Sequence, residues 1–495
     1  MHVADQPLAI VDLGSNSGRV VVLRIDPSGH LEILGDALRL ARDVGNGGRL
    51  SAEAIQRTVD ALKDFQAIAV GTGARRTIAV ATSAIRESKN ADELLQRILL
   101  QSGLAVRIID GEEEARYAFL GAIHGIQAND GMVMDLGGGS LELSRFRDRA
   151  LIESWSLPLG ALRLSDQFLT SDPPGESEVR DARKYARRLL DERRMPPLEA
   201  DEELIGTGGT IRNLAKMDRQ ARTYPIPRLH GYVLTRRRVG DLAQSLLSRS
   251  AARRKAIPGL NADRADSIVG GVLGVEGAMD ALGAGDMTVS NQGLREGLVY
   301  DAAGSPPPPP EEVRRTSIAA LAHRFTSWDA GRADQRARIA LRLMDTLEPE
   351  AGLKAGERLS QAATILDIGR SIDYYRRHEH TADILTESDL AGFSHRKLAL
   401  LAAVVRQAGD EKMNVRAYRP LLGPEDRRPV ARQATFLAIA DEIELRIAPG
   451  KALSVACEEH RRQVIVHAPL FDGYRQGLLA ARFYRAFGKR LVFEP

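Results

Sequence analysis

The chain has 495 residues, too many for a single hydrophobic core, so we expect about three domains. Its hydrophobic content of 43%, charged content of 27% and net charge of +3 are ordinary for a soluble globular protein, and no apolar run approaches the roughly 20 residues that cross a bilayer. The single cysteine, Cys457, excludes an internal disulfide, and the absence of a secretory signal at the N-terminus favours a cytoplasmic protein without a membrane segment.

The first predicted element is a strand over residues 8–11, which runs through a polar turn into a second strand over residues 19–23. The turn reads Asp12-Leu13-Gly14-Ser15-Asn16-Ser17. Glycine lets backbone N–H groups point at an anion, because no Cβ stands in the way. Asp12 would repel a phosphate, so it is better suited to hold a divalent cation that bridges to phosphate oxygens.

The same order of strand, turn and strand recurs about a hundred residues later. Strands over residues 132–134 and 141–144 flank Asp135-Leu136-Gly137-Gly138-Gly139-Ser140. A single copy could be a plain β-hairpin whose Asp and Ser side chains only satisfy turn amides. Two copies in matching context favour a pair of hairpins that clamp a phosphate chain from both sides.

Strand and helix patterns alternate between and around these hairpins, which predicts α/β layers. We expect strands over residues 68–70, 77–81 and 106–109, and helices over residues 91–100 and 113–123.

Two strand-to-helix junctions lie between the hairpins. Residues 81–87 include Arg86, which together with free helix N–H groups could receive an anion, although a simple helix cap is an equally good interpretation. Residues 110–116 carry three consecutive glutamates, Glu112, Glu113 and Glu114. Acidic residues in a first helical turn commonly just stabilise the helix dipole, but three are more than that needs, and one could be a general base for water.

A third glycine-rich turn, residues 205–211, follows another predicted strand and contains Gly208, Gly209 and Thr210. Its amides could line a third wall of the cleft, although one such loop is weak evidence. Residues 258–266, with Arg264, and residues 290–297 complete this part of the chain. The sequence has no GxxxxGK[ST] loop and no GxGxxG after the first strand, which counts against a P-loop NTPase or a dinucleotide enzyme.

Five prolines at residues 306–310 divide the chain, because such a run favours a stiff extended spacer. The part that follows is mainly helical, with a small hairpin over residues 452–456 and 463–467; its helices are expected over residues 313–325, 335–347, 357–368, 396–407 and 433–446. Residues 313–495 hold 30 Lys and Arg against 23 Asp and Glu, mostly as arginine. This excess suggests an extended polyanion as ligand, while an ordinary solvated surface explains it equally well.

In this order and spacing, the motifs resemble the exopolyphosphatase and guanosine pentaphosphate phosphohydrolase family, within the actin-like, sugar kinase and Hsp70 ATPase superfamily. The resemblance covers residues 8–302 and rests on residues 11–19, 81–86, 111–116, 134–142, 206–210 and 293–297. It implies an α/β fold with two actin-like (ribonuclease H-like) domains, residues 1–130 and 131–303, flanking a cleft. A proline-rich linker, residues 304–312, and a mainly α-helical HD-like domain, residues 313–495, which can include a small terminal β subdomain, would follow.

The resemblance implies Mg²⁺-dependent, processive release of terminal phosphate from inorganic polyphosphate by water attack. Glu114 would be the general base, with Glu113 as the alternative, and Glu142 would assist the water or the metal. Asp12 and Asp135 would organise Mg²⁺. The phosphate groups would be bound by the turn residues and by arginines, namely Gly14, Ser15, Asn16, Ser17, Arg19, Arg86, Gly137, Gly138, Gly139, Ser140, Gly208, Gly209, Thr210 and Arg264.

The last domain departs from the HD-type metal site, which needs a leading His, a His-Asp pair and a distal Asp. Leu366 precedes Asp367 where the pair would stand, and His323, His378 and His380 are the histidines nearby. We therefore expect this domain to support the catalytic part, to bind the tail of the polymer and to form a homodimer, rather than to carry metal chemistry.

Other functions stay open at this stage. Guanosine pentaphosphate could be the substrate within the same class, and from another class an ATP-binding kinase or a non-catalytic regulator could use the same hairpins. The glutamates at residues 112–114 favour a hydrolase, because a kinase would exclude water. We expect no nucleic-acid partner.

Overall fold

The computed structural model describes residues 6–15, 17–26, 31–40, 44–45, 48–409, 415–448, 451, 454–468 and 474–494. The chain separates into two compact units, which we call the α/β unit (residues 1–222 and 229–313) and the helical unit (residues 223–228 and 314–495). In the described ranges, no helix is long and apolar enough to cross a membrane.

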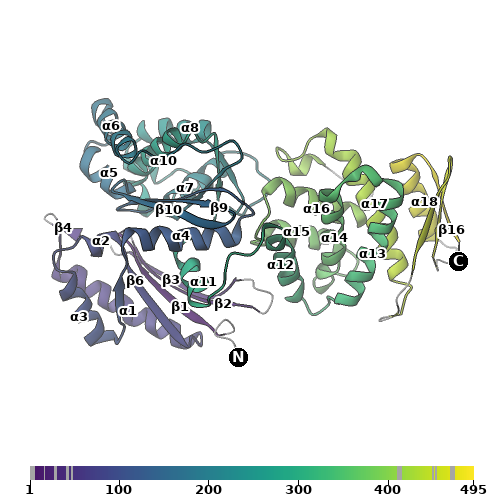
Figure 1. The fold of residues 1–495 in the computed structure, drawn as a ribbon, viewed down its shortest axis with the longest axis horizontal. Helices are drawn as coiled ribbons and strands as arrows, with labels where there is room; N and C mark the ends of the chain where they lie inside the picture. The colour runs from purple at the N-terminus through teal and green to yellow at the C-terminus, as the bar shows by residue number, and fades with distance from the viewer. Residues whose placement is uncertain are drawn as a thin grey trace. The chain divides into compact units, whose positions relative to one another are not determined.

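The α/β unit begins with a five-stranded sheet in the order β3-β2-β1-β6-β7 (Figure 1). The strands β1, β2 and β3 form an antiparallel meander, while β6 and β7 add to β1 in parallel. Their bounds are β1 (Leu8–Leu13), β2 (Ser17–Ile25), β3 (Leu31–Leu40), β6 (Arg76–Ala81) and β7 (Val106–Ile108), beside a separate two-stranded ladder of β4 (Val44–Gly45) and β5 (Arg49–Leu50).

A second sheet, in the order β10-β9-β8-β11-β13-β12, repeats this arrangement. Three strands again form an antiparallel meander, β11 and β13 follow in parallel, and β12 adds an antiparallel edge. The bounds are β8 (Gly131–Leu136), β9 (Leu141–Arg147), β10 (Ala150–Leu157), β11 (Glu203–Thr207), β12 (Val233–Thr235) and β13 (Asp286–Val289). The two predicted hairpins are therefore β1–β2 and β8–β9, at equivalent places in two similar sheets.

Helix α4 (Gly111–Gly125) lies between the two sheets (Figure 1). Its residue Tyr117 packs in a core with Ile10 and Val21 of the first sheet, whereas Phe119 and Ile123 pack against the second. Burial on both faces fixes this helix firmly. The glutamates at its N-terminus are consequently held at the boundary between the sheets.

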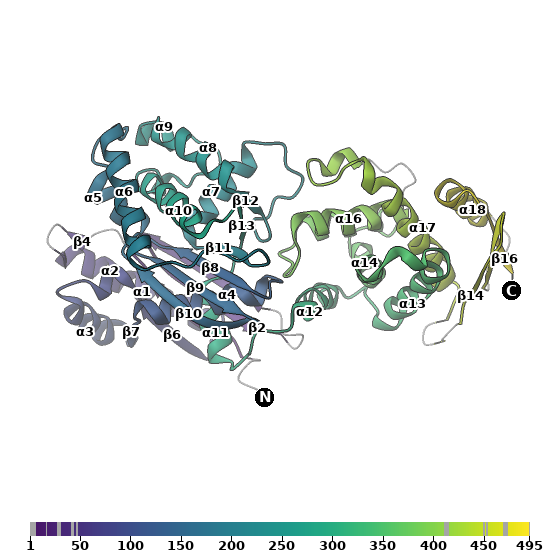
Figure 2. The ribbon, with the colours of Figure 1, turned by 45° about the horizontal axis from the view of Figure 1, so that its top comes forward.

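Most of the remaining helices of the α/β unit cover the outer faces of the sheets, whereas α11 (Leu294–Ala302) packs against α4 on the inner face of the first sheet. Helices α5, α6, α7, α8 and α10 gather on one side of the second sheet (Figure 2). The bounds are α1 (Ala52–Gly71), α2 (Ser83–Arg86), α3 (Ala91–Ser102), α5 (Ala161–Phe168), α6 (Glu176–Glu192), α7 (Gly208–Gln220), α8 (Arg236–Leu247), α9 (Ala251–Arg254), η2 (Ala262–Arg264), α10 (Ile268–Leu282) and α11 (Leu294–Ala302).

One predicted strand is wrong. Residues 68–70 belong to the last turns of α1, which buries Ile55, Leu62 and Phe65 against the first sheet. A short apolar run cannot by itself distinguish a strand from the buried stripe of a helix, and here the 20-residue amphipathic pattern decides.

The helical unit packs its helices around one core that also takes in Ile226 from the short segment 223–228. Its helices are α12 (Pro310–His323), which begins just before the boundary between the units, α13 (Ala330–Leu347), η3 (Pro349–Ala351), α14 (Leu353–Ile365), η4 (Ile368–Ser371), α15 (Arg377–Glu387), α16 (His395–Gly409), η5 (Val415–Tyr418), η6 (Pro424–Asp426), α17 (Arg427–Glu444) and α18 (Tyr474–Phe487). Pro310 thus begins a helix instead of ending the spacer, as suits a residue without a backbone N–H.

A three-stranded sheet, β14-β15-β16, completes this unit. The predicted hairpin exists as β14 (Ala456–Glu459) and β15 (Gln463–His467), although its first strand lies later than residues 452–456, of which 452 and 453 are outside the described residues. The last strand, β16 (Arg490–Glu494), pairs in parallel with β15, a non-local contact that sequence periodicity cannot reveal.

Candidate active site

A pocket of about 340 Å³ opens in the α/β unit where both hairpin turns and the N-termini of α4 and α7 meet. The turns follow the carboxyl ends of β1 and β8, which is the usual place for a ligand site in an α/β sheet. The predicted site residues that line the pocket are Asp12, Gly14, Ser15, Arg19, Glu114, Asp135, Gly137, Gly138, Ser140, Glu142, Gly208, Gly209 and Arg264.

The two hairpins place different partners opposite their aspartates. Asp12 is directly across the β1–β2 ladder from Arg19, whereas Asp135 is across the β8–β9 ladder from Glu142. Facing residues in a ladder lie on the same side of the sheet. The second hairpin therefore presents two carboxylates side by side, and the first presents a carboxylate beside a guanidinium.

Burial and mutual repulsion keep these carboxyl groups easily protonated. Burial, reinforced by the negative charge of Asp12, raises the pKa of Asp135 to about 6, and burial likewise raises the pKa of Asp12. Burial and the neighbouring Glu114 raise the pKa of Glu142 well above its ordinary value. A bound cation would relieve this repulsion, because it stabilises the ionised carboxylates.

The side chains of the three consecutive glutamates of α4 lie in three different environments. Glu112 is exposed. The backbone N–H of Glu113 donates to Oδ1 of Asp110 at 2.8 Å, and its own Oε2 accepts from the N–H of Asp110 at 3.2 Å, so the pair forms a capping box. Glu113 also pairs with Arg107. Only Glu114 is buried and faces the pocket.

Arg86 holds the Glu114 carboxylate in place. Its Nη1 donates to Oε2 of Glu114 at 3.2 Å and to the carbonyl oxygen of Ile109 at 2.7 Å. Burial, followed by repulsion from Asp135, nevertheless raises the pKa of Glu114 to about 7, and Arg86 only partly offsets this. Glu114 therefore exchanges a proton near neutral pH, as a general base should.

Several predicted residues do not line the pocket in the described part of the chain, namely Glu113, Arg86, Gly139 and Thr210. Gly139 lies just behind it, and its carbonyl oxygen accepts from Nε of Arg163 at 2.9 Å. Asn16 lies outside the described residues, as does the side chain of Ser17.

Basic side chains that sequence reasoning had not assigned also line the pocket. They are Arg212 and Lys216 on α7 and Arg295 at the start of α11. Burial, with repulsion from Arg295, lowers the pKa of Arg212 to about 10, so that it stays charged at neutral pH. The sequence does contain a signal for two of these residues. Arg212 and Lys216 are four residues apart on the helix that begins at Gly208, so they lie on the same face of that helix.

Glycine is required where α7 begins. Gly208 has φ of +90°, and a Cβ there would collide with Oδ1 of Asp135; at Gly209 it would collide with the guanidinium of Arg264. The backbone N–H groups of this turn can therefore approach a ligand closely, between an acidic group and a basic one.

Replacing Gly208 by Ala is expected to weaken phosphate binding at least about tenfold and to destabilise the protein by more than the roughly 1 kcal/mol that a positive φ alone costs. Gly283→Ala is the matched control, because Gly283 has φ of +64° and a Cβ added there would meet no atom within 4 Å. Urea unfolding and phosphate titration of both variants check this. Equal effects in the two variants would show that the Cβ added at Gly208 does not collide with Asp135.

The donor set also fits Mg²⁺. Asp12 and Asp135 supply the hard oxygen ligands that this ion prefers. Among the described residues, no group of three or more His, Cys, Asp or Glu is arranged to hold a metal alone. Two carboxylates would therefore hold Mg²⁺ only together with water and phosphate oxygens, which commonly complete its shell.

Together, the fold and the pocket define an enzyme class that binds phosphate and acts on phosphoryl groups. The carboxylates can hold a cation and activate water, while the arginines and turn amides can bind phosphate oxygens. Comparison with known proteins agrees: residues 21–305 match the Ppx/GppA phosphatase family, and residues 313–441 match Ppx/GppA phosphatase, domain III. The chain belongs to the Ppx/GppA phosphatase family.

Similar proteins include Exopolyphosphatase 1 of Mycobacterium tuberculosis, 32% identical over 318 residues that cover 63% of this chain and 92% of that protein. Exopolyphosphatase 2 of the same organism is 31% identical over 317 residues, covering 60% of this chain and 98% of its own. Among solved structures, the Aquifex aeolicus Ppx/GppA family member is 30% identical with a TM-score of 0.53, covering 60% of this chain and 98% of that one. An exopolyphosphatase from Cytophaga hutchinsonii is 27% identical with a TM-score of 0.56 over the same shares.

Proposed function

We propose that this protein is an exopolyphosphatase, which removes terminal phosphate from inorganic polyphosphate by attack of a water molecule that Glu114 activates. The observation that carries the proposal is the environment of Glu114. It is the one buried glutamate of the three at the start of α4, it faces the phosphate pocket, and its pKa is raised to about 7 by burial. A kinase would direct such a base at a substrate hydroxyl and would exclude water from the pocket.

In this proposal, Glu114 accepts the proton of the attacking water, and Arg86 keeps its carboxylate aimed into the pocket. Glu142, which accepts a hydrogen bond from Oγ of Ser156 at 3.0 Å, helps to orient the water. Asp12 and Asp135 would hold Mg²⁺, which when bound neutralises charge on the phosphate oxygens.

The phosphate chain is held from both hairpins. Turn amides around Gly14, Gly137 and Gly208 bind the bridging and terminal oxygens. In the described part of the chain, five basic side chains line the pocket and neutralise the terminal phosphoryl group: Arg19, Arg212, Lys216, Arg264 and Arg295. Phosphoryl transfer depends mainly on such positioning and charge neutralisation, so little covalent help is needed.

The basic helical unit supports the polymer as substrate, because an excess of arginine suits a long polyanion. We propose that it is HD-like, that it holds the tail of the chain so that hydrolysis is processive, and that the enzyme acts as a homodimer. Guanosine pentaphosphate is the second candidate substrate, because the motifs resemble a family that includes guanosine pentaphosphate phosphohydrolases.

Phosphate release from long polyphosphate, guanosine pentaphosphate and ATP, compared side by side with Mg²⁺, tests the proposal. We expect the highest kcat/KM for polyphosphate, loss of activity when EDTA removes the metal, and recovery when MgCl₂ is returned. A preference for guanosine pentaphosphate would establish the second candidate. A preference for ATP would place the protein in another functional class.

A further inference from the structure

The helical unit contains a second pocket, of about 320 Å³, formed between α15, α16, α17 and α18. Four arginines line it, together with one histidine, three carboxylates, two tyrosines and several apolar side chains. The charged and histidine residues are Arg376, Arg377, Arg406, Arg482, His378, Glu379, Asp441 and Glu442.

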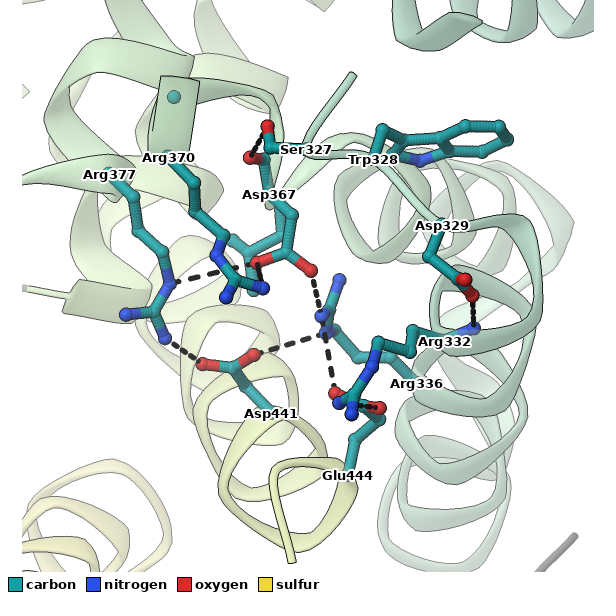
Figure 3. A network of polar contacts seen from close by, with 12 residues as sticks. Ser327, Trp328, Asp329, Arg332, Arg336, Asp367, Arg370, Arg377, Asp441 and Glu444 are labelled. Atoms are coloured by element: carbon teal, nitrogen blue, oxygen red, sulfur yellow. Dashed lines mark hydrogen bonds and ion pairs between the residues drawn. The ribbon is translucent and has the colours of Figure 1, made fainter. Parts of the chain in front are cut away.

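One end of this pocket rests on a buried charge network (Figure 3). The guanidinium of Arg336, only 1% exposed, lies among three carboxylates: it pairs with Asp367, with Asp441 at 3.1 Å and with Glu444 at 3.5 Å. Arg377 joins the network through Asp441 at 2.6 Å. Arg332 pairs in turn with Glu444 at 2.6 Å, so Arg336, Arg377 and Arg332 together balance the charge of the three carboxylates.

The carboxylates that face the pocket are similarly engaged by arginines. Burial alone would raise the pKa of Asp441, but Arg336 and Arg377 outweigh it and hold that pKa below its ordinary value. Glu442 accepts from Nη1 of Arg446 at 2.7 Å, and Glu379 pairs with Arg376. These carboxylates therefore offer little repulsion to an anion that enters.

Arg376, in contrast, has hydrogen-bonding capacity beyond its ion pair with Glu379. A guanidinium carries five N–H donors, whereas Arg376 uses only its Nε and Nη2 for Glu379. Arg406 pairs with Asp383 and forms a hydrogen bond with Tyr418, and Nη1 of Arg482 donates to the carbonyl oxygen of Ala408 at 2.7 Å. Burial lowers the pKa of His378 to about 4, so this ring is neutral and adds no charge at neutral pH.

The remaining walls of this pocket carry aromatic and apolar side chains. Tyr374 lies under the guanidinium of Arg377 at 5.1 Å and edge-on to Tyr375 at 5.5 Å, and Tyr375 is 90% exposed. Leu478 of α18 is 43% exposed. Exposed rings and an exposed leucine beside guanidinium groups can receive the organic part of a ligand whose phosphate the arginines bind.

We propose that this pocket binds a small phosphate-bearing anion, with Arg376 and Arg406 as its main contacts. The site is separate from the pocket of Glu114 and lies wholly within the helical unit, so it does not depend on the proposed hydrolase function. Guanidinium groups bind phosphate oxygens in two-point fashion, and the pocket volume is in the range of small-molecule sites. A nucleoside phosphate and a short phosphate chain share the chemistry that this site recognises.

The test uses the full-length protein, with ADP and pyrophosphate as separate probes and hydrogen exchange followed by mass spectrometry. Each probe that binds here is expected to slow exchange in peptides covering Arg377–Glu387 and Tyr474–Phe487. Peptides covering Gly208–Gln220 report binding in the first pocket separately. Arg376→Ala and Arg406→Ala should weaken the protection of α15 and α18 about tenfold or more in probe concentration, while protection of α7 is unchanged.

Arg490→Ala is the matched control, because Arg490 is exposed in β16, outside the pocket lining, and loses the same charge. The Arg376 side chain is 63% exposed, so Arg376→Ala should leave the melting temperature unchanged. This variant therefore tests the proposal even if Arg406→Ala folds poorly. Protection by pyrophosphate equal to that by ADP would support a phosphate-chain ligand, and protection by ADP alone a nucleoside phosphate. Absence of protection by both probes, or equal behaviour of Arg376→Ala and Arg490→Ala, would overturn the proposal.

Discussion

Glu114→Gln is expected to lower the rate of phosphate release from polyphosphate by about 10²–10⁴-fold while the polymer still binds. Glutamine keeps the size of the side chain and can still accept from Arg86, but its amide oxygen cannot take a proton from water. The measurement is single-turnover phosphate release, together with a filter-binding affinity for polyphosphate.

Glu113→Gln is the control for this experiment. Glu113 is the neighbouring residue, but its side chain caps α4 and pairs with Arg107. We expect near-normal turnover from this variant and a loss of no more than about 1 kcal/mol in stability. Unchanged turnover in Glu114→Gln would reject Glu114 as the base and direct attention to Glu142.

The pH profile gives a second readout of the same prediction. The pKa of Glu114 is raised to about 7 by burial, and only the ionised form can act as a base. The kcat/KM of the unaltered protein should therefore fall as the pH drops through about 7. In Glu114→Gln the fall near pH 7 should disappear from the residual rate, and any pH dependence that remains belongs to Asp135 and Glu142, whose pKa values burial also raises.

Arg336→Met is expected to lower the free energy of unfolding by about 3–5 kcal/mol, because it leaves the three buried carboxylates one positive charge short, with Arg377 and Arg332 as remaining partners. Methionine fills a similar volume, so the loss arises from charge more than from a cavity. Urea unfolding followed by circular dichroism measures it, with attention to a transition of the helical unit.

Arg338→Met is the matched control, because Arg338 lies two residues away on α13, is exposed and loses the same charge. It should change stability by less than about 0.5 kcal/mol. Arg336→Lys keeps a cation near Asp367 and Asp441 and should recover part of the loss. Equal losses in the Met and Lys variants would show that the packing of Arg336, and not its charge, stabilises the unit.

The sequence pattern predicts correctly the turns and the helix start that depend only on neighbouring residues. The turns after β1 and β8 were predicted from glycine, aspartate and serine next to apolar strands, and both line the pocket. The start of α4 was predicted from the acidic run before an apolar helix, and the structure shows the reason, since Asp110 and Glu113 form a capping box. The strand predicted at residues 68–70 is wrong, because a short apolar run can be buried equally well in a strand or on one face of a helix.

The choice among the three glutamates needed the tertiary structure. They are adjacent in the sequence, but about 100° separates successive side chains on a helix, so packing on both sheets decides which one is buried. Glu114 points to Asp135 and Arg86, and Glu113 turns back to its own cap. The family resemblance favours Glu114, and the packing of α4 supplies the geometric reason.

The sequence by itself determined that two glycine-bearing hairpins, an acidic helix start and an arginine-rich helical part lie in one chain, in an order that resembles a phosphatase family. Those signals are local, because turns, caps and composition act within a few residues. Only the tertiary structure decided that Arg212, Lys216 and Arg295 complete the first pocket, and that Arg336 supplies the cation among Asp367, Asp441 and Glu444. Charged residues far apart in the chain attract one another strongly only after folding brings them together and removes them from water. Their spacing in the sequence therefore does not predict which of them pair.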